Sequence, residues 1–536
     1  MSARSDDDTV DHIIVGAGSA GCALAHRLVR DSGLSVLLVE AGPAHSHRLL
    51  RVPKGFARTV DDPRFSRHYP TAPSDGRASG EPWIRGRGVG GSSLINGMIY
   101  NRGSAADHDA VAAAGNPGWG WTEMLSAFRA LEDHGLGASP LRGTGGPLPV
   151  EVPEPRDELS AAILRAGAAR GLEPRTDLNA SDEQRIGPIP STIRGGARIS
   201  AAEAFLRPLR GHNRLRVLDR AQVGTLLFDG RRVRGVRLRR DGAVRDHFCR
   251  GEVVLCAGAV EDPLLLERSG IGDAAVLGRA GLPVRVDSPH VGERVLEHRG
   301  VSVRARLRRG LGRNRALGTG LGLAGSALAY LARRGPLATG PYDLACFLRS
   351  TARAARPDAM GLLTGLSVLP EAERLAPAPY AGLTFTGYAL RPTTASSVHA
   401  GGPDPADPPV ITPRFLESEE ERRVTAAVLE AGRALLASEP LRTLVEAEEA
   451  PGPEVQDAEG AYRYAMSTGG GLYHAVGSCA MGAADTDAVD SALRVRGIEG
   501  LRVADASVFP MMPSGNTAAP VMAAAWHAAG LMLRDQ

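Results

Sequence analysis

The fold is decided near the amino terminus by residues 11–21, which read DHIIVGAGSAG. The short apolar run that ends at Val15 is typical of a buried parallel strand. It leads into three glycines with G-x-G-x-x-G spacing, and then into residues 22–28, whose apolar spacing predicts a helix. A second apolar run, residues 35–39, ends at Glu40. Strand, glycines, helix, strand and acid in this order predict a dinucleotide-binding unit.

Each part of this motif has a chemical reason. Gly16 permits a tight turn, Gly18 lets the backbone approach a pyrophosphate, and Gly21 allows the helix to pack closely on the strand. The helix N-terminus offers free N–H groups and the positive end of its dipole to a phosphate. Glu40 is placed to accept hydrogen bonds from the adenosine ribose hydroxyls. The alternative, an ordinary glycine-rich loop, does not explain an acidic residue at this position.

A second segment, residues 83–103, reads WIRGRGVGGSSLINGMIYNRG. Its glycines and serines allow backbone to lie against a large planar cofactor, and Asn96 offers a donor and an acceptor at that surface. The segment resembles the first signature of the glucose–methanol–choline (GMC) oxidoreductases, which are FAD enzymes. Other segments match that family in the same order, from residue 10 almost to the end of the chain: 195–200, 258–272, 291–293, 335–337, 473–482, 501–507 and 514–520.

The resemblance implies an α/β fold with two discontinuous domains. A Rossmann-like FAD-binding domain is expected over 9–45, 83–150, 205–300 and 470–536. A substrate-binding domain with an antiparallel sheet is expected over 151–204 and 301–469. The residue pattern itself predicts the following elements: strands of a small antiparallel unit at 215–218 and 233–238, a buried strand at 252–258, a packed helix at 317–332, an amphipathic helix at 417–438 and a helix at 523–533.

Oxidation of an alcohol removes a hydroxyl proton and a carbon-bound hydride, so the reaction needs a base. Histidine suits that role because its ordinary pKa, about 6.5, lies near neutral pH. Of the 14 histidines, His474 lies among small residues and matches the family's catalytic histidine; the alternative is a satisfied core histidine. Asn516 matches the partner position, where its amide can stabilise an alkoxide without titrating. The alternative for Asn516 is ordinary turn chemistry.

The other histidines receive no catalytic role. His298 and His399 are expected as structural or solvated residues, and His527 is expected at the surface. His45 and His47 form an i, i+2 pair in a polar loop, and no metal site is predicted there or elsewhere.

The resemblance also implies the cofactor contacts. These are Gly16, Gly18, Ser19, Ala20, Gly21, Glu40, Ala41, Gly91, Ser92, Asn96, Gly97, Met98, Ile99, Val223, Ala257, Asp505, Ala506, Asn516 and Thr517. The chain departs from the family at Asp262, Glu297 and Ala518, which leaves the fine geometry near the flavin open. Members that bind flavin covalently have a histidine before the asparagine of the first signature. Ile95 stands there in this chain, so we expect non-covalent FAD.

Composition excludes several other classes. The 536 residues exceed what one core accommodates, and 43% apolar with 23% charged residues is ordinary for a globular protein. A formal charge of +3 favours neither nucleic-acid nor membrane binding. The only lysine is Lys54, so no P-loop is present and a pyridoxal-phosphate enzyme is disfavoured. Five dispersed cysteines and a polar amino terminus predict a cytoplasmic protein without a disulfide framework.

The sequence therefore predicts an FAD-dependent enzyme that oxidises a small alcohol. His474 would accept the hydroxyl proton, Asn516 would hold the oxygen, and the hydride would pass to flavin N5. Two alternatives stay open at this point: a non-redox lyase or decarboxylase of the same family that retains FAD, and a cofactor-bearing protein without catalysis. The electron acceptor, oxygen or a quinone-like molecule, is also open, as are the substrate and the oligomeric state.

Overall fold

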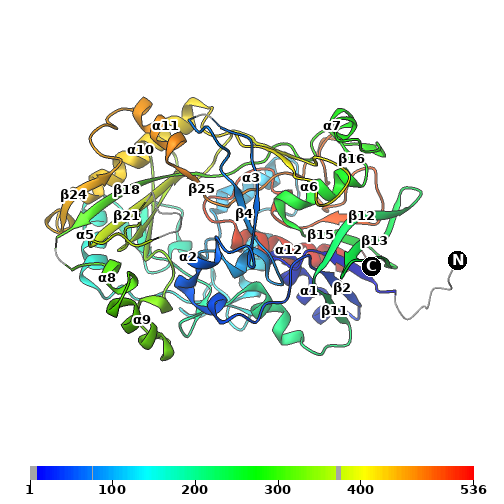
Figure 1. Cartoon of the computed structure of the whole chain (residues 1–536), viewed down its shortest axis with the longest axis horizontal. Helices are drawn as coiled ribbons and strands as arrows, with labels where there is room; N and C mark the ends of the chain where they lie inside the picture. Colours follow the sequence, from blue (N-terminus) through cyan, green and yellow to red (C-terminus); the bar gives the residue numbers. More distant parts are fainter. Residues whose placement is uncertain (1–8, 75, 309, 370–375, 536) are drawn as a thin grey trace.

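The computed structural model describes residues 9–74, 76–308, 310–369 and 376–535. A five-stranded parallel sheet lies at one end of the molecule (Figure 1). Its strand order is β11 (Leu215–Leu218), β2 (Val36–Val39), β1 (His12–Val15), β15 (Val253–Leu255) and β26 (Leu501–Val503). Strands β1, β2 and β15 are buried along their whole length, as expected for a parallel sheet covered on both faces. Segments from four distant parts of the chain therefore build the expected α/β core.

The first helix and the last helix pack together beside this sheet. They are α1 (Ser19–Asp31) and α12 (Ala518–Arg534). The helix predicted at 523–533 is confirmed, and it begins five residues earlier than the pattern indicates. Pro520 in its first turn explains the difference, because a proline there removes no intrahelical hydrogen bond.

The expected pairing of residues 215–218 is wrong. Leu215 pairs in parallel with Val36, so β11 is the edge strand of the parallel sheet. The small antiparallel unit consists instead of β12 (Ala221–Asp229), β13 (Arg232–Arg240) and β14 (Ala243–Phe248), which includes the strand predicted at 233–238. Strand β11 is only partly buried at the edge of the sheet, so its sequence lacks the continuous apolar run of a central parallel strand.

A larger sheet occupies the other end of the molecule (Figure 1). Its order is β24 (Val445–Ala450), β18 (Arg299–Leu307), β21 (Gly382–Ala389), β20 (Ala359–Thr364), β19 (Leu344–Leu348), β8 (Arg185–Pro188) and β7 (Glu173–Pro174), with β25 (Gly470–Gly471) also paired to β18. All of these pairs are antiparallel except β7 with β8.

Two helices pack against this sheet and share its apolar core: α5 (Glu158–Ala169) and α10 (Glu419–Leu436). The amphipathic helix predicted at 417–438 is thereby confirmed. A capping box between Ser418 and Glu421 sets its first turn. We keep the division of the chain into two discontinuous domains as a proposal.

The chain also forms other helices and strands outside the two large sheets. They are α2 (Phe56–Thr59), β3 (Ser66–Tyr69), β4 (Trp83–Gly86), α3 (Ala105–Ala113), α4 (Trp121–Leu131), β5 (Glu132–His134), β6 (Leu148–Val150), β9 (Ile193–Arg194), β10 (Ala197–Arg198), α6 (Gly258–Arg268), β16 (Ile271–Gly272), α7 (Ala274–Arg279), β17 (Val286–Asp287), β22 (Ser397–His399), β23 (Val410–Thr412) and α11 (Ala458–Ser467).

The helix expected at 317–332 forms in part, but the expectation of one continuous packed helix is wrong. The segment forms two helices, α8 (Asn314–Leu317) and α9 (Leu321–Leu331), separated at Gly318–Gly320. Leu321 in α9 is 93% exposed and Leu331 is 80% exposed. Apolar spacing predicts a helix, but it does not show whether another element covers the apolar face of that helix. Among the residues that the structure describes, no helix combines the length and the apolar character needed to cross a bilayer.

Candidate active site

The glycine motif forms a tight backbone cradle at the carboxyl end of β1. Gly16 has φ +101°, and a Cβ there would lie 2.4 Å from the carbonyl oxygen of Cys256. A Cβ on Gly21 would lie 1.9 Å from the carbonyl oxygen of Gly16, which confirms the close helix–strand packing. No side chain caps the N-terminus of α1 at Gly18. Free helix amides beside a glycine turn are suited to a phosphate group.

The second glycine segment closes this cradle from the opposite side. Gly91 has φ +52°, and a Cβ there would lie 2.6 Å from the Cα of Gly18. The two glycine segments therefore touch backbone to backbone. An enclosed hollow opens behind them, lined by residues that include Ser19, Ser93, Asn96 and Ala518. The hollow brings together three predicted cofactor contacts, Ser19, Asn96 and Ile99, and Ala518, one of the departures from the family.

Glu40 follows β2, as expected, and holds the backbone of two loops. Its carboxylate accepts hydrogen bonds from the N–H of Ala17 at 3.0 Å and of Gly42 at 2.8 Å. Burial raises the pKa of Glu40 to about 7, because its effect is larger than that of the backbone hydrogen bonds, which lower the pKa. Ala41 follows directly, and Val223 lies in the adjoining β12. Contact of Glu40 with a ribose stays a prediction.

Arg198 is a buried residue of this region that the sequence analysis leaves without a role. Its Nη1 donates to the side-chain oxygen of Asn96 at 2.7 Å and to the carbonyl oxygen of Ser93 at 3.2 Å. Its Nε and Nη2 have no hydrogen-bond partner, and burial lowers its pKa to about 9. In the sequence, the only sign that Arg198 belongs to the site is its position within the matched segment 195–200. A buried guanidinium without a carboxylate is suited to an anionic ligand.

Two carboxyl groups meet beyond the ends of β15 and β26. Asp505 accepts from the N–H of Gly258, and Asp262 accepts from the N–H of Ala257 at 2.9 Å. Ser507 Oγ donates to Asp505 at 2.7 Å, beside the predicted contact Ala506. Burial and the neighbouring Asp505 raise the pKa of Asp262 well above its usual range. The departure at residue 262 therefore places an acid with a raised pKa beside Asp505.

His474 is fixed through its backbone by Glu297, another of the departures. A single oxygen of Glu297 accepts from the N–H of His474 at 2.7 Å and from the N–H of His298 at 2.9 Å. Arg85 lies 3.7 Å from the other oxygen. Burial raises the pKa of Glu297 to about 6. Glu297 thus fastens two histidine-bearing segments to each other.

The imidazole of His474 lies between His298 and Asn516. Its Nδ1 is 2.9 Å from Nδ1 of His298, and its Nε2 is 3.0 Å from the amide nitrogen of Asn516. Nε2 of His298 is 3.0 Å from the carbonyl oxygen of Leu390. The predicted catalytic pair is therefore adjacent. His298, expected as a structural or solvated histidine, is fully buried and contacts His474 directly.

These contacts determine where the protons lie. A carbonyl oxygen can only accept, so His298 donates its Nε2–H to Leu390 and accepts at Nδ1. His474 must then donate from Nδ1, which leaves a lone pair on its Nε2. Burial lowers the pKa of His474 well below its usual value, and burial lowers that of His298 to about 4. Both rings are neutral at neutral pH, with a basic nitrogen facing Asn516.

The remaining histidines lie away from this pair. His399 is held between Glu267 at 2.7 Å and Glu293 at 3.1 Å, as a structural residue should be. His527 is half-buried with its ring 5.0 Å from that of Trp119, so the expected surface position is wrong. Helix α12 turns that face towards α4 rather than to solvent. Within the described ranges, no group of three His, Cys, Asp or Glu residues could hold a metal ion.

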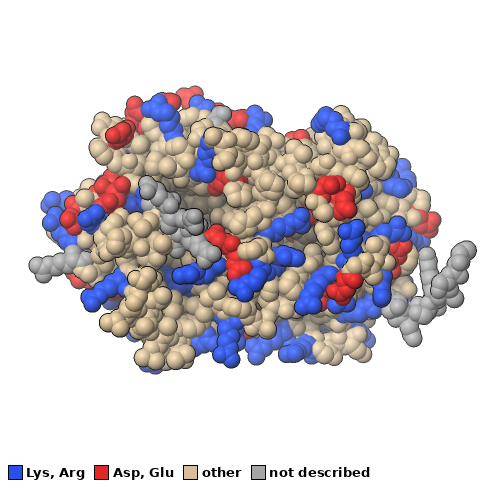
Figure 2. All heavy atoms as spheres, in the orientation of Figure 1, with Lys and Arg blue, Asp and Glu red and all other residues tan. Residues whose placement is uncertain are grey.

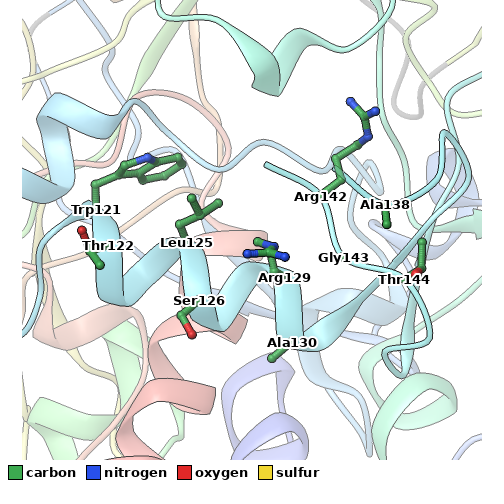
Figure 3. Close-up of a pocket in the computed structure, with 10 residues that line it drawn as sticks. All are labelled: Trp121, Thr122, Leu125, Ser126, Arg129, Ala130, Ala138, Arg142, Gly143 and Thr144. Atoms are coloured by element: carbon green, nitrogen blue, oxygen red, sulfur yellow. The ribbon is translucent and has the colours of Figure 1, made fainter. Parts of the chain in front are cut away.

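Another hollow lies away from these residues. A groove of about 680 Å³ lies between α4 and the loop 138–144. Figure 3 shows its lining residues, among them Trp121, Arg129 and Arg142. None of the residues discussed above lines it, and Arg142 is paired with Asp177 at 2.8 Å. The groove is therefore separate from the candidate active site.

Comparison with known proteins agrees with this geometry. Two family models described as GMC oxidoreductase match residues 10–299 and 392–525. The chain belongs to the GMC oxidoreductase family. It is accordingly an FAD-dependent oxidoreductase, and its α/β fold is that of the family. The glycine cradle, the uncapped α1 and the unpaired Arg198 are observations of this structure that fit such an anionic dinucleotide.

Individual relatives span nearly the whole chain. An alcohol dehydrogenase [acceptor] of Pseudomonas putida is 31% identical over 98% of this chain and 96% of its own. Mitochondrial choline dehydrogenase of Homo sapiens is 33% identical over 98% of this chain and 90% of its own. Pyridoxine 4-oxidase from Mesorbium loti superposes with a TM-score of 0.89 at 30% identity, over 98% of this chain and 99% of that one. A formate oxidase with a TM-score of 0.91 and 24% identity, over 99% of both chains, shows the same fold.

Proposed function

We propose that this GMC oxidoreductase oxidises a CH–OH group of a small alcohol to a carbonyl, with His474 as the base. The observation that carries the proposal is the 3.0 Å contact between Nε2 of His474 and the amide nitrogen of Asn516. A lone pair and an N–H donor this close can both reach one substrate oxygen. Relatives named alcohol dehydrogenase, choline dehydrogenase and pyridoxine 4-oxidase support the same class of reaction.

FAD, when bound, supplies the acceptor for the hydride that leaves the substrate carbon. The residues that would hold it include Gly16, Gly18, Gly91 and Asn96, with Arg198 behind Asn96. Ile95 is buried and has no nucleophilic atom, so we propose that the FAD is non-covalent. Acid precipitation should leave the yellow colour in the supernatant, and a coloured pellet would contradict this assignment.

His474 removes the hydroxyl proton at Nε2. Because its pKa is depressed, the ring is unprotonated and ready to act at neutral pH. Once protonated at Nε2, it still donates its Nδ1–H to His298 at 2.9 Å, so no ring needs to turn. The positive charge forms beside Glu297, whose carboxylate already binds the His474 backbone.

Asn516 stabilises the oxygen from which the proton leaves. Once Nε2 of His474 has taken the proton it can no longer accept from Asn516, so the amide N–H that faced it is free to donate to the developing alkoxide. Its side-chain oxygen is buried without a partner, so the amide is not committed elsewhere through that atom. The aromatic ring of Tyr388 lies 6.0 Å from that of His474 and provides an apolar wall for a carbon substituent.

Anaerobic mixing with a panel of alcohols tests the proposal. At least one primary or secondary alcohol should bleach the flavin absorbance, whereas a lyase or a decarboxylase that retains FAD would turn over without net flavin reduction. Re-oxidation with air and with a quinone then distinguishes the two classes of acceptor. The absence of bleaching across a broad panel would overturn the redox assignment.

A further inference from the structure

Helix α9 turns its apolar side outward. Leu321, Leu328 and Leu331 are 93%, 70% and 80% exposed, the highest values among the large apolar side chains of the described residues. Their spacing places them along one helical face, and Ala324 on the same face is also exposed. Only Ser326 of this helix is buried, where its Oγ donates to the carbonyl oxygen of Ala316 at 2.7 Å. An ordinary surface helix has the opposite arrangement.

The two chain segments at α9 are rich in arginine and have no acidic residue in their sequence. Residues 298–342, which include α8 and α9, have no Asp or Glu, and neither do residues 41–60. The second segment packs beside the first, since η3 (Pro53–Gly55) contacts η8 (Pro336–Ala338) and the hydroxyl of Tyr330 donates to the carbonyl oxygen of Arg51 at 3.1 Å. The exposed arginines of these two segments are Arg48, Arg51, Arg58, Arg308, Arg315, Arg333 and Arg334.

Most of these arginines form no ion pair with a carboxylate of the described residues. Over the part of the chain that the structure describes, only Arg51 has a carboxylate partner, Glu203 at 3.4 Å. Figure 2 shows uncharged surface over α8 and α9 at the lower left. We call Leu321, Leu328, Leu331, Arg315, Arg333 and Arg334 the α9 patch.

We propose that this protein docks on the surface of a bilayer containing anionic lipids, through the α9 patch. Leucines on one face of a short helix are suited to the boundary between headgroups and acyl chains, and unpaired arginines beside them are suited to anionic headgroups. The 11 residues of α9 span roughly 16 Å, about half the apolar thickness of a bilayer. The helix would therefore lie along the surface rather than across it.

Charge favours a bilayer over a second copy of this chain. If two α9 patches met face to face, each set of unpaired arginines would confront the same set on the other copy. An anionic bilayer instead supplies both an apolar layer and the missing negative charge. The overall charge of +3 hides this local arrangement, which is why the composition does not predict a membrane partner.

The α9 patch is connected to the candidate active site by a short segment. Lys54 donates to the carbonyl oxygen of Gly340, and the ring of Pro341 lies 3.3 Å from where a Cβ on Gly97 would be. Tyr342 next to it packs in the same apolar cluster as Tyr388. Docking would bring this side of the site close to the acyl chains, so an apolar alcohol or quinone could enter from the lipid. This consequence rests on the proposed function, whereas the docking itself does not.

Co-sedimentation of the FAD-loaded protein with vesicles tests the proposal. Vesicles of phosphatidylcholine with phosphatidylglycerol are compared with vesicles of phosphatidylcholine alone, at low and high salt. The wild type should sediment with the anionic vesicles only, and less so at high salt. A Leu321→Glu/Leu328→Glu/Leu331→Glu variant and an Arg315→Gln/Arg333→Gln/Arg334→Gln variant should each lower the partition coefficient about tenfold or more.

A matched control carries the same three charges elsewhere. Val244, Val284 and Val410 are 57%, 53% and 54% exposed, and their triple Glu variant should sediment as the wild type does. FAD content and thermal unfolding confirm that each variant is folded. Flavin reduction by a water-soluble alcohol should be the same in the leucine variant, so a failure of docking is distinguishable from a failure of the proposed chemistry.

Three results would overturn the proposal. The first is a wild type that stays in the supernatant with anionic vesicles, and the second is a leucine variant that sediments as well as the wild type. The third is a wild-type dimer by light scattering that the leucine variant converts into a monomer, because the patch would then bind a second copy.

Discussion

His298 and His474 face each other through their Nδ1 atoms at a distance of 2.9 Å. The carbonyl oxygen of Leu390 fixes the proton of His298 on the opposite nitrogen, 3.0 Å away. The tautomer of His474 is therefore set by a residue 176 positions away in the sequence. We therefore propose that His298 acts on the reaction through His474, as a positioning residue.

Replacement of His298 tests this relationship. His298→Phe removes the acceptor for the Nδ1–H of His474, which frees the ring to adopt the wrong tautomer, and flavin reduction should slow by at least about tenfold. His298→Gln retains an acceptor oxygen and should recover part of the rate. Stopped-flow reduction by a saturating alcohol measures both. Equal rates in the Phe and Gln variants, with FAD still bound, would show that His298 only fills space.

Replacement of Asn516 tests the stabilisation of the substrate oxygen. Asn516→Ala removes the N–H donor beside Nε2 of His474 and should slow flavin reduction by about 10²- to 10³-fold. The apparent affinity for FAD should change little, because the loss concerns the transition state. A variant that reduces its flavin at the wild-type rate would assign Asn516 to the turn alone.

The pH dependence of flavin reduction follows from the depressed pKa of His474. Since only the neutral ring accepts a proton, the rate should stay constant as the pH falls through 6.5, the usual histidine value, and should decline only at lower pH. Glu297, with a pKa of about 6, titrates in the same range. Glu297→Gln separates its contribution, and an acidic limb that persists at or above pH 6.5 in this variant would contradict the assignment.

The contact between the two glycine segments predicts the effect of a single methyl group. Gly91→Ala would place a Cβ 2.6 Å from the Cα of Gly18 and should abolish or strongly weaken FAD binding. Gly230→Ala is the matched control, because Gly230 has a similar φ of +60° but no atom within 4 Å of the added Cβ. FAD content after purification, together with titration of the apoprotein, measures the difference. Equal loss of FAD in the two variants would assign the effect to backbone strain and not to the cradle. Full FAD content in Gly91→Ala would contradict the predicted contact.

The sequence predicts local features of this molecule well. The turn at Gly16, the helix packing at Gly21 and the amphipathic α10 depend on residues close together in the chain, so spacing alone reports them. The pairing of Leu215 with Val36 and the contact of His298 with His474 join distant segments, and no local pattern contains them. The exposure of Leu321 could not be predicted for a related reason. Periodicity shows which residues are apolar but not whether another element covers them.

The central claim is that His474 takes the substrate proton while bound flavin is reduced. The most direct measurement is anaerobic stopped-flow flavin reduction by the best alcohol of a panel, in the wild type and in His474→Ala with equal FAD content. We predict that the wild type bleaches rapidly and that the variant is slower by about 10²- to 10⁴-fold. Equal rates in the two proteins, or no bleaching of the wild type by any alcohol, would contradict the claim.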